Sequence, residues 1–368
     1  MKIIIFGPDL NNNTGAYGGG QGGIVSAISR MLEYFDKHKI NYIYSEYSTR
    51  SLGRLWLFLL PYRLFKDVAR FVQICAVSAD QKIVHIVADG GLSIFRSFAA
   101  ILISKIFRIK VVCDVRGNAL DMTAANSESF LIKYIWYYII RSSGSVLVQS
   151  SRVSMLLNKK FKGKIIHYPN SINTNDAVPR SKNVLSSSLI DVIFIGYCYR
   201  GKGIFDAVNG CIAASKEGLN LRLTLIGQED HDFTSFCDTI PGYSNLQIRR
   251  LGRLPKSLTF KYLFESDVFL FPSFHPGEGH PNVINEAMLA KLVIVTTDVG
   301  AVSEILDKTM ALFINKNSHI DISKKLIFIN SNREISANMG FVAHNHLLLN
   351  YSADLVFAKL SNIYKKLI

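Results

Sequence analysis

Strand-like and helix-like segments alternate along the whole chain. The strand-like segments are short runs of β-branched and aromatic residues, and the segments between them repeat apolar residues at helical spacing. This alternation predicts α/β domains in which helices cover parallel sheets, because consecutive parallel strands need a crossover connection. The expected strands are residues 2–6, 41–44, 82–87, 110–115, 145–149 and 164–167 in the first half, and 192–196, 221–226, 246–250, 268–271, 293–296 and 311–313 in the second.

The length of the chain suits two such domains. At 368 residues it exceeds the size at which a single hydrophobic core usually stops growing. Residues 171–188 are polar and contain Pro179 and three consecutive serines, which is typical of a linker. We therefore expect an N-terminal domain over residues 1–173 and a C-terminal domain over residues 174–351. Ligands of open α/β sheets bind beyond the carboxyl ends of the strands, so the cleft between the domains is the expected site.

Two glutamates, Glu278 and Glu286, lie where a strand is expected to end and a helix to begin. Residues 272–279 are rich in chain breakers, and apolar residues recur at helical spacing after Pro281, which is expected in the first turn. On a continuous helix the two carboxylates would point about 80° apart. They converge on one ligand only if Glu278 lies in the loop. The alternative is a solvated loop glutamate beside a surface helix glutamate, and it would be preferred for an isolated pair.

The expected helix start leaves the amides of Asn282, Val283 and Ile284 without partners inside the helix. Free amides and the helix dipole make such an end a site for an anion such as a diphosphate. The two carboxylates would accept hydrogen bonds from sugar hydroxyl groups. A diphosphate site beside such a pair favours a nucleotide sugar as the ligand.

The spacing of Glu278 and Glu286 resembles the E-x7-E signature of retaining GT-B glycosyltransferases of family four. Further segments between residues 165 and 310 resemble the same family, whereas the N-terminal half is similar to it only in layout. Residues 168–171 resemble the family's interdomain segment, 191–203 its diphosphate loop, 223–227 the next strand and turn, 251–254 the strand before the base contact, and 293–305 the strand and turn after the signature.

This resemblance implies a GT-B fold, in which two Rossmann-like domains face each other across a cleft. It also implies a last helix, about residues 352–368, that packs back onto the N-terminal domain. Glu278 would hold hydroxyl groups of the donor sugar, and Glu286 those of the ribose. The other donor contacts that the resemblance implies are Gly196, Gly227, Arg253, Gly279, His280, Pro281, Asn282 and Val283.

Lys202 follows a strand and a turn, at the position of the family's phosphate-binding lysine. A cation placed there lowers the barrier, because negative charge builds on the departing diphosphate in the transition state. The family has an arginine directly after the glycine that ends this strand, whereas this chain has Tyr197. Arg200 either replaces that arginine as a second catalytic cation or is a solvated loop residue, and the sequence leaves both open.

A glycine cluster occupies residues 15–23, and Gly18, Gly20 and Gly23 fit the dinucleotide-binding pattern G-x-G-x-x-G. That pattern requires the glycines directly after the first strand, whereas eleven residues separate Phe6 from Gly18. The cluster therefore predicts a long loop that leads into a helix, with a surface loop free of ligand contacts as the alternative. The residues whose amides would approach the donor phosphate or the acceptor are Gly19, Gly20, Gly22 and Gly23.

Several titratable side chains are candidates for the cleft. Asp114 and Arg116 end an apolar strand, so we expect them at its carboxyl edge, on the acceptor side. His85 occupies one of two positions at which relatives carry histidines, and Val87 occupies the other. His85 is equally well explained as a core residue with satisfied hydrogen bonds. Glu304 resembles a family position near the donor, and it also suits the first turn of a helix.

Positive charge is concentrated in the N-terminal half. Residues 1–175 hold 22 of the 42 Lys and Arg residues but only 10 of the 28 Asp and Glu residues, so most of the net charge of +14 lies there. Residues 52–72 and 131–141 mix basic with bulky apolar residues, without the run of about 20 apolar residues that spans a bilayer. We expect 52–72 to lie on an anionic membrane surface and 131–141 to bury one face in the domain. Nucleic acid is not an expected partner, because no helix-turn-helix or RNP-like pattern is present.

Neither a metal nor a cofactor is expected. The five cysteines have no zinc-type spacing and are most simply explained as reduced thiols of a cytosolic protein. Lys202 and the helix amides would take the place of a divalent cation at the diphosphate. The first apolar run ends at Phe6 and is too short for a signal peptide.

Together these features predict a retaining glycosyltransferase that moves a hexose-type sugar from a nucleotide-diphosphate sugar to a lipid-linked oligosaccharide. By the family resemblance, the leaving phosphate helps to deprotonate the acceptor on the same face, so no protein nucleophile is implied. We expect the enzyme to act in the synthesis of O-antigen, capsule or exopolysaccharide, on the inner face of the cytoplasmic membrane. The alternatives are another GT-B activity, such as a nucleotide-sugar epimerase or a phosphorylase, and a non-enzymatic basic protein that binds membranes.

Overall fold

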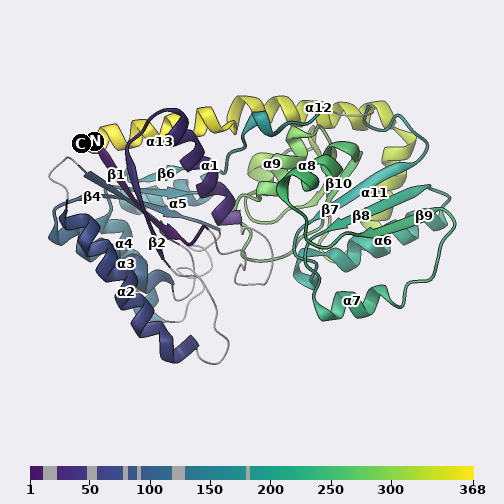
Figure 1. Cartoon of the computed structure of the whole chain (residues 1–368). Coiled ribbons are helices and arrows are strands. Elements are labelled where there is room, and N and C mark those ends of the chain that lie inside the picture. The colour runs from purple at the N-terminus through teal and green to yellow at the C-terminus, as the bar shows by residue number, and fades with distance from the viewer. Residues whose placement is uncertain (11–22, 48–55, 78–81, 89–92, 118–128, 180–182) are drawn as a thin grey trace.

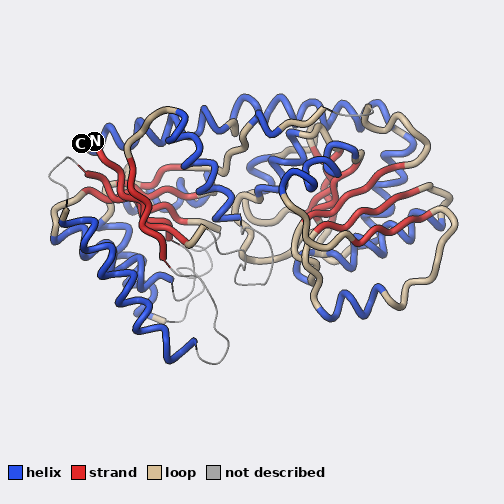
Figure 2. The backbone as a smooth tube through the Cα atoms, in the orientation of Figure 1, coloured by secondary structure: helices blue, strands red, loops and turns tan. Residues whose placement is uncertain are grey.

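The computed structural model describes seven stretches of the chain, which form two α/β domains side by side (Figure 1). Each domain is built on a six-stranded parallel sheet with helices outside it (Figure 2). All twelve strands expected from the sequence are present, so the predicted fold class is confirmed. The described stretches are residues 1–10, 23–47, 56–77, 82–88, 93–117, 129–179 and 183–368.

The strands of the N-terminal sheet follow the order β2-β1-β3-β4-β5-β6, and every neighbouring pair is parallel. The central strands are buried on both faces, which explains why they are continuous apolar runs rather than alternating ones. The strands are β1 (Lys2–Pro8), β2 (Tyr42–Tyr47), β3 (Lys82–Ala88), β4 (Lys110–Val115), β5 (Ser145–Val148) and β6 (Ile165–His167).

Helices cover both faces of this sheet and form two separate apolar layers. One layer contains buried residues of four helices and of the sheet face below them. The other joins the first helix and the last helix of the chain to the opposite face. The first layer is formed by α2 (Trp56–Ala76), α3 (Ser93–Ile106), α4 (Phe130–Ser142) and α5 (Ser151–Phe161), and the second by α1 (Gly23–Lys37) and α13 (Ala353–Leu367).

The C-terminal sheet is also parallel throughout, with the order β12-β11-β10-β7-β8-β9. Its strands are β7 (Ile190–Ile195), β8 (Leu221–Ile226), β9 (Leu246–Arg250), β10 (Val268–Phe271), β11 (Val293–Thr297) and β12 (Ala311–Ile314). Its helices are α6 (Ile204–Lys216), α7 (His231–Cys237), α8 (Lys256–Glu265), α9 (Asn282–Leu289), α10 (Val302–Ile305), α11 (His319–Ser331) and α12 (Arg333–Asn350), with short 3₁₀ turns η3 (Thr174–Asp176) and η4 (Arg200–Lys202).

The chain crosses between the domains twice, and the two crossings are hydrogen-bonded to each other. The amide of Ile172 donates to the carbonyl of Tyr351 at 3.0 Å, and the amide of Ala353 donates to the carbonyl of Ile172 at 2.8 Å. After the second crossing, α13 buries Phe357 and Tyr364 against the N-terminal sheet. Figure 1 shows α12 and α13 running in one line along both domains. The last helix therefore belongs structurally to the N-terminal domain.

The helices differ in length, but none in the described part of the chain is both long and apolar enough to cross a membrane.

Candidate active site

Glu278 lies in the loop between β10 and α9, as its spacing from Glu286 requires. Glu278 is 8% exposed, and its carboxylate contacts the ammonium of Lys202, which ends the turn η4 after β7. The hydroxyl of Ser273 donates to the same carboxylate oxygen at 2.9 Å. Ser273 is fully buried, and its carbonyl accepts a hydrogen bond from the hydroxyl of Thr297 at the end of β11. Glu278 is thus fixed to the end of the sheet, and Lys202 reaches it from the neighbouring strand.

Glu286 follows within α9, on the side of the helix that faces the N-terminal domain. Burial raises the pKa of its carboxyl group, the nearby positive charges of Arg30 and Lys256 oppose this shift, and Asp176 adds to it. Among the described residues, no hydrogen bond or ion pair at contact distance holds this carboxylate. Glu286 therefore has acceptor capacity that the described part of the protein leaves unused.

The N-termini of two helices meet beside these carboxylates. The side-chain amide of Asn282, the first residue of α9, donates to the carbonyl of Gly23, the first residue of α1, at 2.8 Å. The guanidinium of Arg30 donates to the side-chain oxygen of Asn282 at 2.6 Å. Each helix start carries a partial positive charge, so their meeting point favours an anion. Of the three amides expected to be free, that of Ile284 donates to the carbonyl of Pro281 at 3.2 Å, so this part of the expectation was wrong.

Arg30 is a site residue that the sequence analysis missed. It is buried at 5% exposure, where burial lowers the pKa of its guanidinium and the charge of Glu286 opposes this shift. Its position on α1 places it among the buried residues Ala27 and Met31. An arginine on the apolar face of an amphipathic helix is the only sequence pattern that could have marked it.

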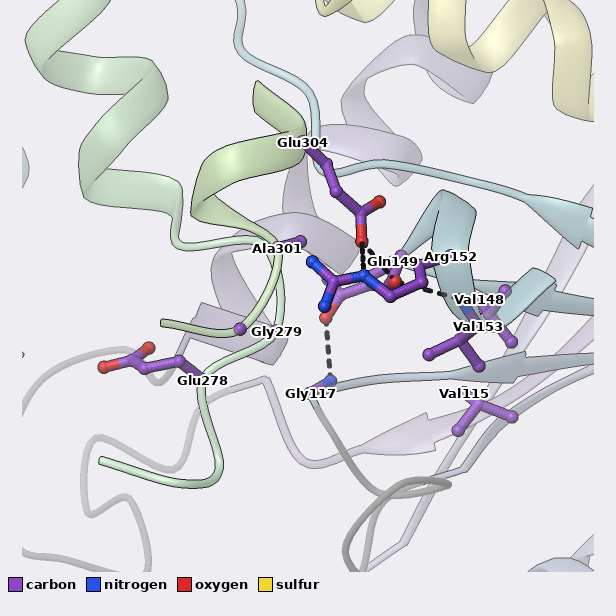
Figure 3. Close-up of a pocket in the computed structure, with 12 residues that line it drawn as sticks. Val115, Gly117, Val148, Gln149, Arg152, Val153, Glu278, Gly279, Ala301 and Glu304 are labelled. Atoms are coloured by element: carbon purple, nitrogen blue, oxygen red, sulfur yellow. Dashed lines mark hydrogen bonds and ion pairs between the residues drawn. The ribbon is translucent and has the colours of Figure 1, made fainter. Parts of the chain in front are cut away.

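The two domains contact each other around a small cavity of about 60 Å³ next to the Glu278 loop (Figure 3). In Figure 3 the carboxylate of Glu278 points away from Gln149 and Glu304, which line this cavity. A Cβ atom on Gly279 would lie 2.3 Å from the side-chain oxygen of Gln149, so only glycine allows this close approach. The cavity is too small for a nucleotide sugar. The polar side of Glu278 that faces Lys202 is therefore the better candidate for ligand binding.

Glu304 joins the domains at the edge of this cavity. Its carboxylate accepts hydrogen bonds from the hydroxyl of Ser150 at 2.6 Å and from the amide of Ser151 at 2.5 Å. These groups form the start of α5, where a negative charge is favourable. Burial alone would raise the pKa of Glu304, but the serine hydrogen bonds outweigh it and lower that pKa. Glu304 thus caps a helix of the other domain.

Residues 190–332, which include Lys202, Glu278 and Glu286, match the family model described as Glycosyl transferases group 1. The chain is similar over its full length to HepE of Anabaena, whose structure was solved with UDP. That match has a TM-score of 0.73 and 12% sequence identity and covers 100% of both chains. This chain has the GT-B fold. The match to the glycosyl transferase group 1 model lies within its C-terminal domain.

Two curated glycosyltransferases are similar in sequence to this GT-B chain. It is 24% identical to the uncharacterized glycosyltransferase MJ1059 of Methanocaldococcus jannaschii over 280 residues, which cover 72% of this chain and 65% of MJ1059. It is 29% identical to the putative teichuronic acid biosynthesis glycosyltransferase TuaC of Bacillus subtilis over 129 residues, which cover 34% of this chain and 29% of TuaC. The matched segment thus spans less than two thirds of the length of either relative.

Several predicted donor residues of the GT-B chain lie at the ends of its strands. Gly196 and Gly227 directly follow β7 and β8, and a Cβ atom on Gly227 would lie 1.8 Å from the carbonyl oxygen of Gly196. Val283 is partly buried against the core, and Arg253 is exposed in the turn after β9. Pro281 caps α9 rather than lying in its first turn.

The structure does not bring Arg200 to Glu278. Its guanidinium lies over the ring of Phe205, 4.7 Å from the ring centroid, and it lines a separate hollow between α6 and α7. Arg200 and Lys202 leave the tight turn η4 in different directions. The Phe205 ring holds the guanidinium of Arg200 at the hollow between α6 and α7. The expectation that Arg200 acts as a second catalytic cation is therefore not supported by its placement.

The side chain of His280, one of the predicted donor contacts, packs in the protein core. It is 3% exposed, its ring is 2.9 Å from the side-chain oxygen of Asn285, and it packs edge-on against Tyr351. Burial lowers the pKa of the His280 imidazole to about 4. The loop places its carbonyl, not its ring, towards Asn170, whose amide donates to that carbonyl at 2.6 Å.

Asp114 and Arg116 are also buried, at 1% and 2% exposure, so the expectation that they face an acceptor was wrong. The Nε of Arg116 donates to Asp114 at 2.8 Å, and its Nη1 donates to Asn170 at 2.7 Å. His85 lies between Asp114, at 3.3 Å, and the hydroxyl of Tyr364, at 2.7 Å. The interdomain segment covers this end of β4, which removes both charges from the cleft. His85 is the satisfied core residue that the sequence allowed.

An aromatic pair that the sequence analysis did not single out lies beside Lys202. The hydroxyl of Tyr199 is 2.7 Å from Nδ1 of His275, and the ring of Tyr197 lies 5.2 Å from that of Tyr199. Burial and the charge of Lys202 lower the pKa of His275, and Glu278 opposes this shift. Tyr197, where the resemblance implied an arginine, is thus part of an aromatic wall.

Other expectations lie outside the described residues or concern metals. Gly19, Gly20 and Gly22 are not described, whereas Gly23 begins α1. Within the described chain, no three His, Cys, Asp or Glu side chains gather as a metal site would need. The sequence from Asp230 to Asp232 has Asp-x-Asp spacing, but Asp230 caps α7 through the amide of Phe233 at 2.8 Å.

Proposed function

We propose that this protein is a retaining glycosyltransferase that moves a hexose-type sugar from a nucleotide-diphosphate sugar to a lipid-linked oligosaccharide in surface polysaccharide synthesis. One observation carries the proposal: the Lys202–Glu278 contact lies in the same strand-end loop region that leads into α9. A cation, a sugar-binding carboxylate and a helix end are the three groups that a nucleotide-diphosphate sugar requires. The glycosyl transferase group 1 match over this segment supports the same assignment.

The donor diphosphate would be held between Lys202 and the meeting helix starts. Hydrogen bonds of Arg30 and Asn282 hold the N-termini of α1 and α9 together, so the positive ends of both helix dipoles would stabilise the same anion. HepE, which shares the fold, was solved with UDP and with UDP-glucose. On this arrangement Lys202 leaves Glu278 when the diphosphate arrives.

Glu278 would then accept hydrogen bonds from the hydroxyl groups of the donor sugar. Ser273 keeps the carboxylate in place after Lys202 has left, because it donates to Glu278 from a fully buried position. Glu286 would accept the ribose hydroxyls with its unused oxygens. Glu278 would thus bind the sugar of the donor, and Glu286 would bind its ribose.

Bond cleavage would place negative charge on the departing diphosphate, where Lys202 and the helix ends stabilise it without reorganisation. The leaving phosphate would take the proton of the acceptor hydroxyl on the same face, so the sugar keeps its anomeric configuration. This route uses neither a protein nucleophile nor a metal ion. The acceptor would enter from the N-terminal domain, at the inner face of the cytoplasmic membrane.

The test is a transfer assay with a panel of nucleotide-diphosphate hexoses and lipid-diphosphate oligosaccharide acceptors, with and without a chelator. We expect one donor to give a glycosylated lipid with retained anomeric configuration by NMR, and the chelator to leave the rate unchanged. Lys202→Met should lower the rate by about 100-fold or more. The exposed Lys216→Met serves as control. Sugar isomerisation without acceptor, or transfer that is unchanged in Lys202→Met, would contradict the proposal.

A further inference from the structure

The helices α4 and α5 expose large apolar side chains next to each other, at the edge of the sheet that faces the other domain. Exposed fractions are 82% for Phe130, 56% for Leu131 and 53% for Tyr134 on α4. On α5 they are 65% for Met155 and 56% for Leu156. Exposed apolar groups of this size are unusual when they cluster, and a cluster marks a contact surface. We name these five side chains the rim patch.

The rim patch is continuous because the two helices run in parallel and touch. Both helices connect parallel strands, so both begin at the carboxyl edge of the sheet. Lys160 lies over the ring of Tyr137 at 5.1 Å, and the rings of Tyr137 and Phe161 are 5.7 Å apart. One helical turn earlier, this register places Tyr134 beside Leu156. The patch therefore spans the N-terminal halves of both helices.

The surroundings of the rim patch are basic. Between Glu128 and Asp176 the sequence contains no Asp or Glu but seven Lys and Arg residues. Lys133, Arg152 and Lys159 are exposed next to the apolar side chains. The carboxylate that reaches α5 from the other domain is Glu304. It is bound to Ser150 and Ser151 and lies 3.9 Å from Arg152, so Lys133 and Lys159 are the cations that carry the argument. An anionic partner is the one that this charge distribution fits.

We propose that the rim patch is where the protein docks on an anionic lipid bilayer, with its apolar side chains at the headgroup boundary and its cations on the lipid phosphates. The inference rests on the proposed function only in taking the acceptor to be lipid-linked. Apolar side chains with interspersed lysines suit the membrane interface, whereas a nucleic acid backbone offers no partner for five exposed apolar groups. The sequence predicted that residues 131–141 bury one face in the domain. Ile135 and Trp136 are on that buried face, and Leu131 and Tyr134 are exposed.

Docking by the rim patch would bring the membrane to the mouth of the cleft. The starts of α4 and α5 share the sheet edge with Gly117 and Gln149, which contact the Glu278 loop. A lipid-linked acceptor could then keep its tail in the bilayer while its polar end enters between the domains. The α13 face of the same domain points the other way and serves as the internal control.

The experiment is co-sedimentation of the full chain with phosphatidylglycerol-containing vesicles and with pure phosphatidylcholine vesicles, at low and at high salt. We expect binding to the anionic vesicles that weakens with salt. Leu156→Ser should weaken it about tenfold, and Lys133→Glu and Lys159→Glu at least about fivefold each. The exposed controls Ile335→Ser on α12 and Lys365→Glu on α13 should bind like the wild type.

Equal vesicle binding by the wild type, Leu156→Ser and Lys159→Glu would overturn the proposal, as would binding to RNA but not to vesicles. Melting temperatures check that each variant is folded, and the charge variants keep the test valid if Leu156→Ser is not. Transfer to a water-soluble acceptor separates the two proposals. Rim-patch variants should transfer sugar to the water-soluble acceptor at the wild-type rate. Wild-type vesicle binding without any transfer would overturn the proposed function and leave the docking surface standing.

Discussion

The ammonium of Lys202 contacts the carboxylate of Glu278, although 76 residues separate them in the chain. The turn after β7 and the loop after β10 bring them together, because these two strands are neighbours in the sheet. In the proposed mechanism each has its own part of the donor to hold. The contact therefore couples the diphosphate position to the sugar position, and ligand binding must break it.

Glu278→Gln should separate binding of the diphosphate by Lys202 from binding of the donor sugar by Glu278. The change removes the charge that holds Lys202, so we expect UDP, taken as the test nucleotide, to bind about fivefold more tightly. Sugar transfer should fall by about 100-fold or more, because the amide is a poorer acceptor for the sugar hydroxyls. Calorimetry gives the first quantity and initial rates the second. The exposed Glu217→Gln is the matched control, and a parallel loss of UDP affinity and transfer would contradict the coupling.

The positions of the strands along the chain, the two parallel sheets and the loop position of Glu278 could be predicted from the sequence. Parallel strands buried on both faces leave continuous apolar runs, and the breakers from Pro272 to Gly279 mark the loop. These are local patterns. They carry information about each element but not about which elements face each other.

The main differences from expectation at the candidate site concern side-chain direction or burial by distant segments. Asp114 and Arg116 end a strand, as expected, but Asn170 from the interdomain segment covers them. Arg200 is two residues from Lys202 and points to Phe205 instead. Arg30 is an ordinary helix residue in the sequence, and only the arrangement of the domains gives it Asn282 as a partner. Such contacts follow from tertiary packing and leave no local pattern.

Asp114→Asn tests the assignment of that carboxylate to the core. Burial alone would raise the pKa of Asp114, but the charge of Arg116 outweighs it and lowers the pKa, so the carboxylate stays ionised and paired. The variant leaves a buried arginine without its counter-ion, and the free energy of unfolding should fall by about 3–5 kcal/mol in denaturant titrations. Asp354→Asn, at an exposed pair with Lys37, should change it by less than about 1 kcal/mol. A stable Asp114→Asn protein with only a raised acceptor KM would show that the residue faces the cleft.

His280 should make the stability of the protein depend on pH below neutrality. Burial holds its pKa at about 4 in the folded chain, against an ordinary value of 6.5. The unfolded chain binds more protons between these values, so stability is full above pH 6.5 and is lost as the pH falls towards 4, by about 3 kcal/mol. His280→Gln should remove much of this slope in unfolding titrations at several pH values. The exposed His231→Gln should keep the wild-type slope, and an unchanged slope in His280→Gln would contradict this origin.

Glu304→Gln should loosen the contact between the domains. The carboxylate of Glu304 accepts hydrogen bonds from Ser150 and Ser151 at the start of α5, and charged acceptors make these bonds stronger than neutral ones. Replacement of this carboxylate by an amide should weaken the contact between the two domains by about 1–3 kcal/mol. Small-angle scattering should then show a larger radius of gyration than for the wild type, while the exposed Glu334→Gln leaves it unchanged. If both variants scatter like the wild type, the domains are held by other contacts, and the Asn170 bridge to His280 becomes the next position to change.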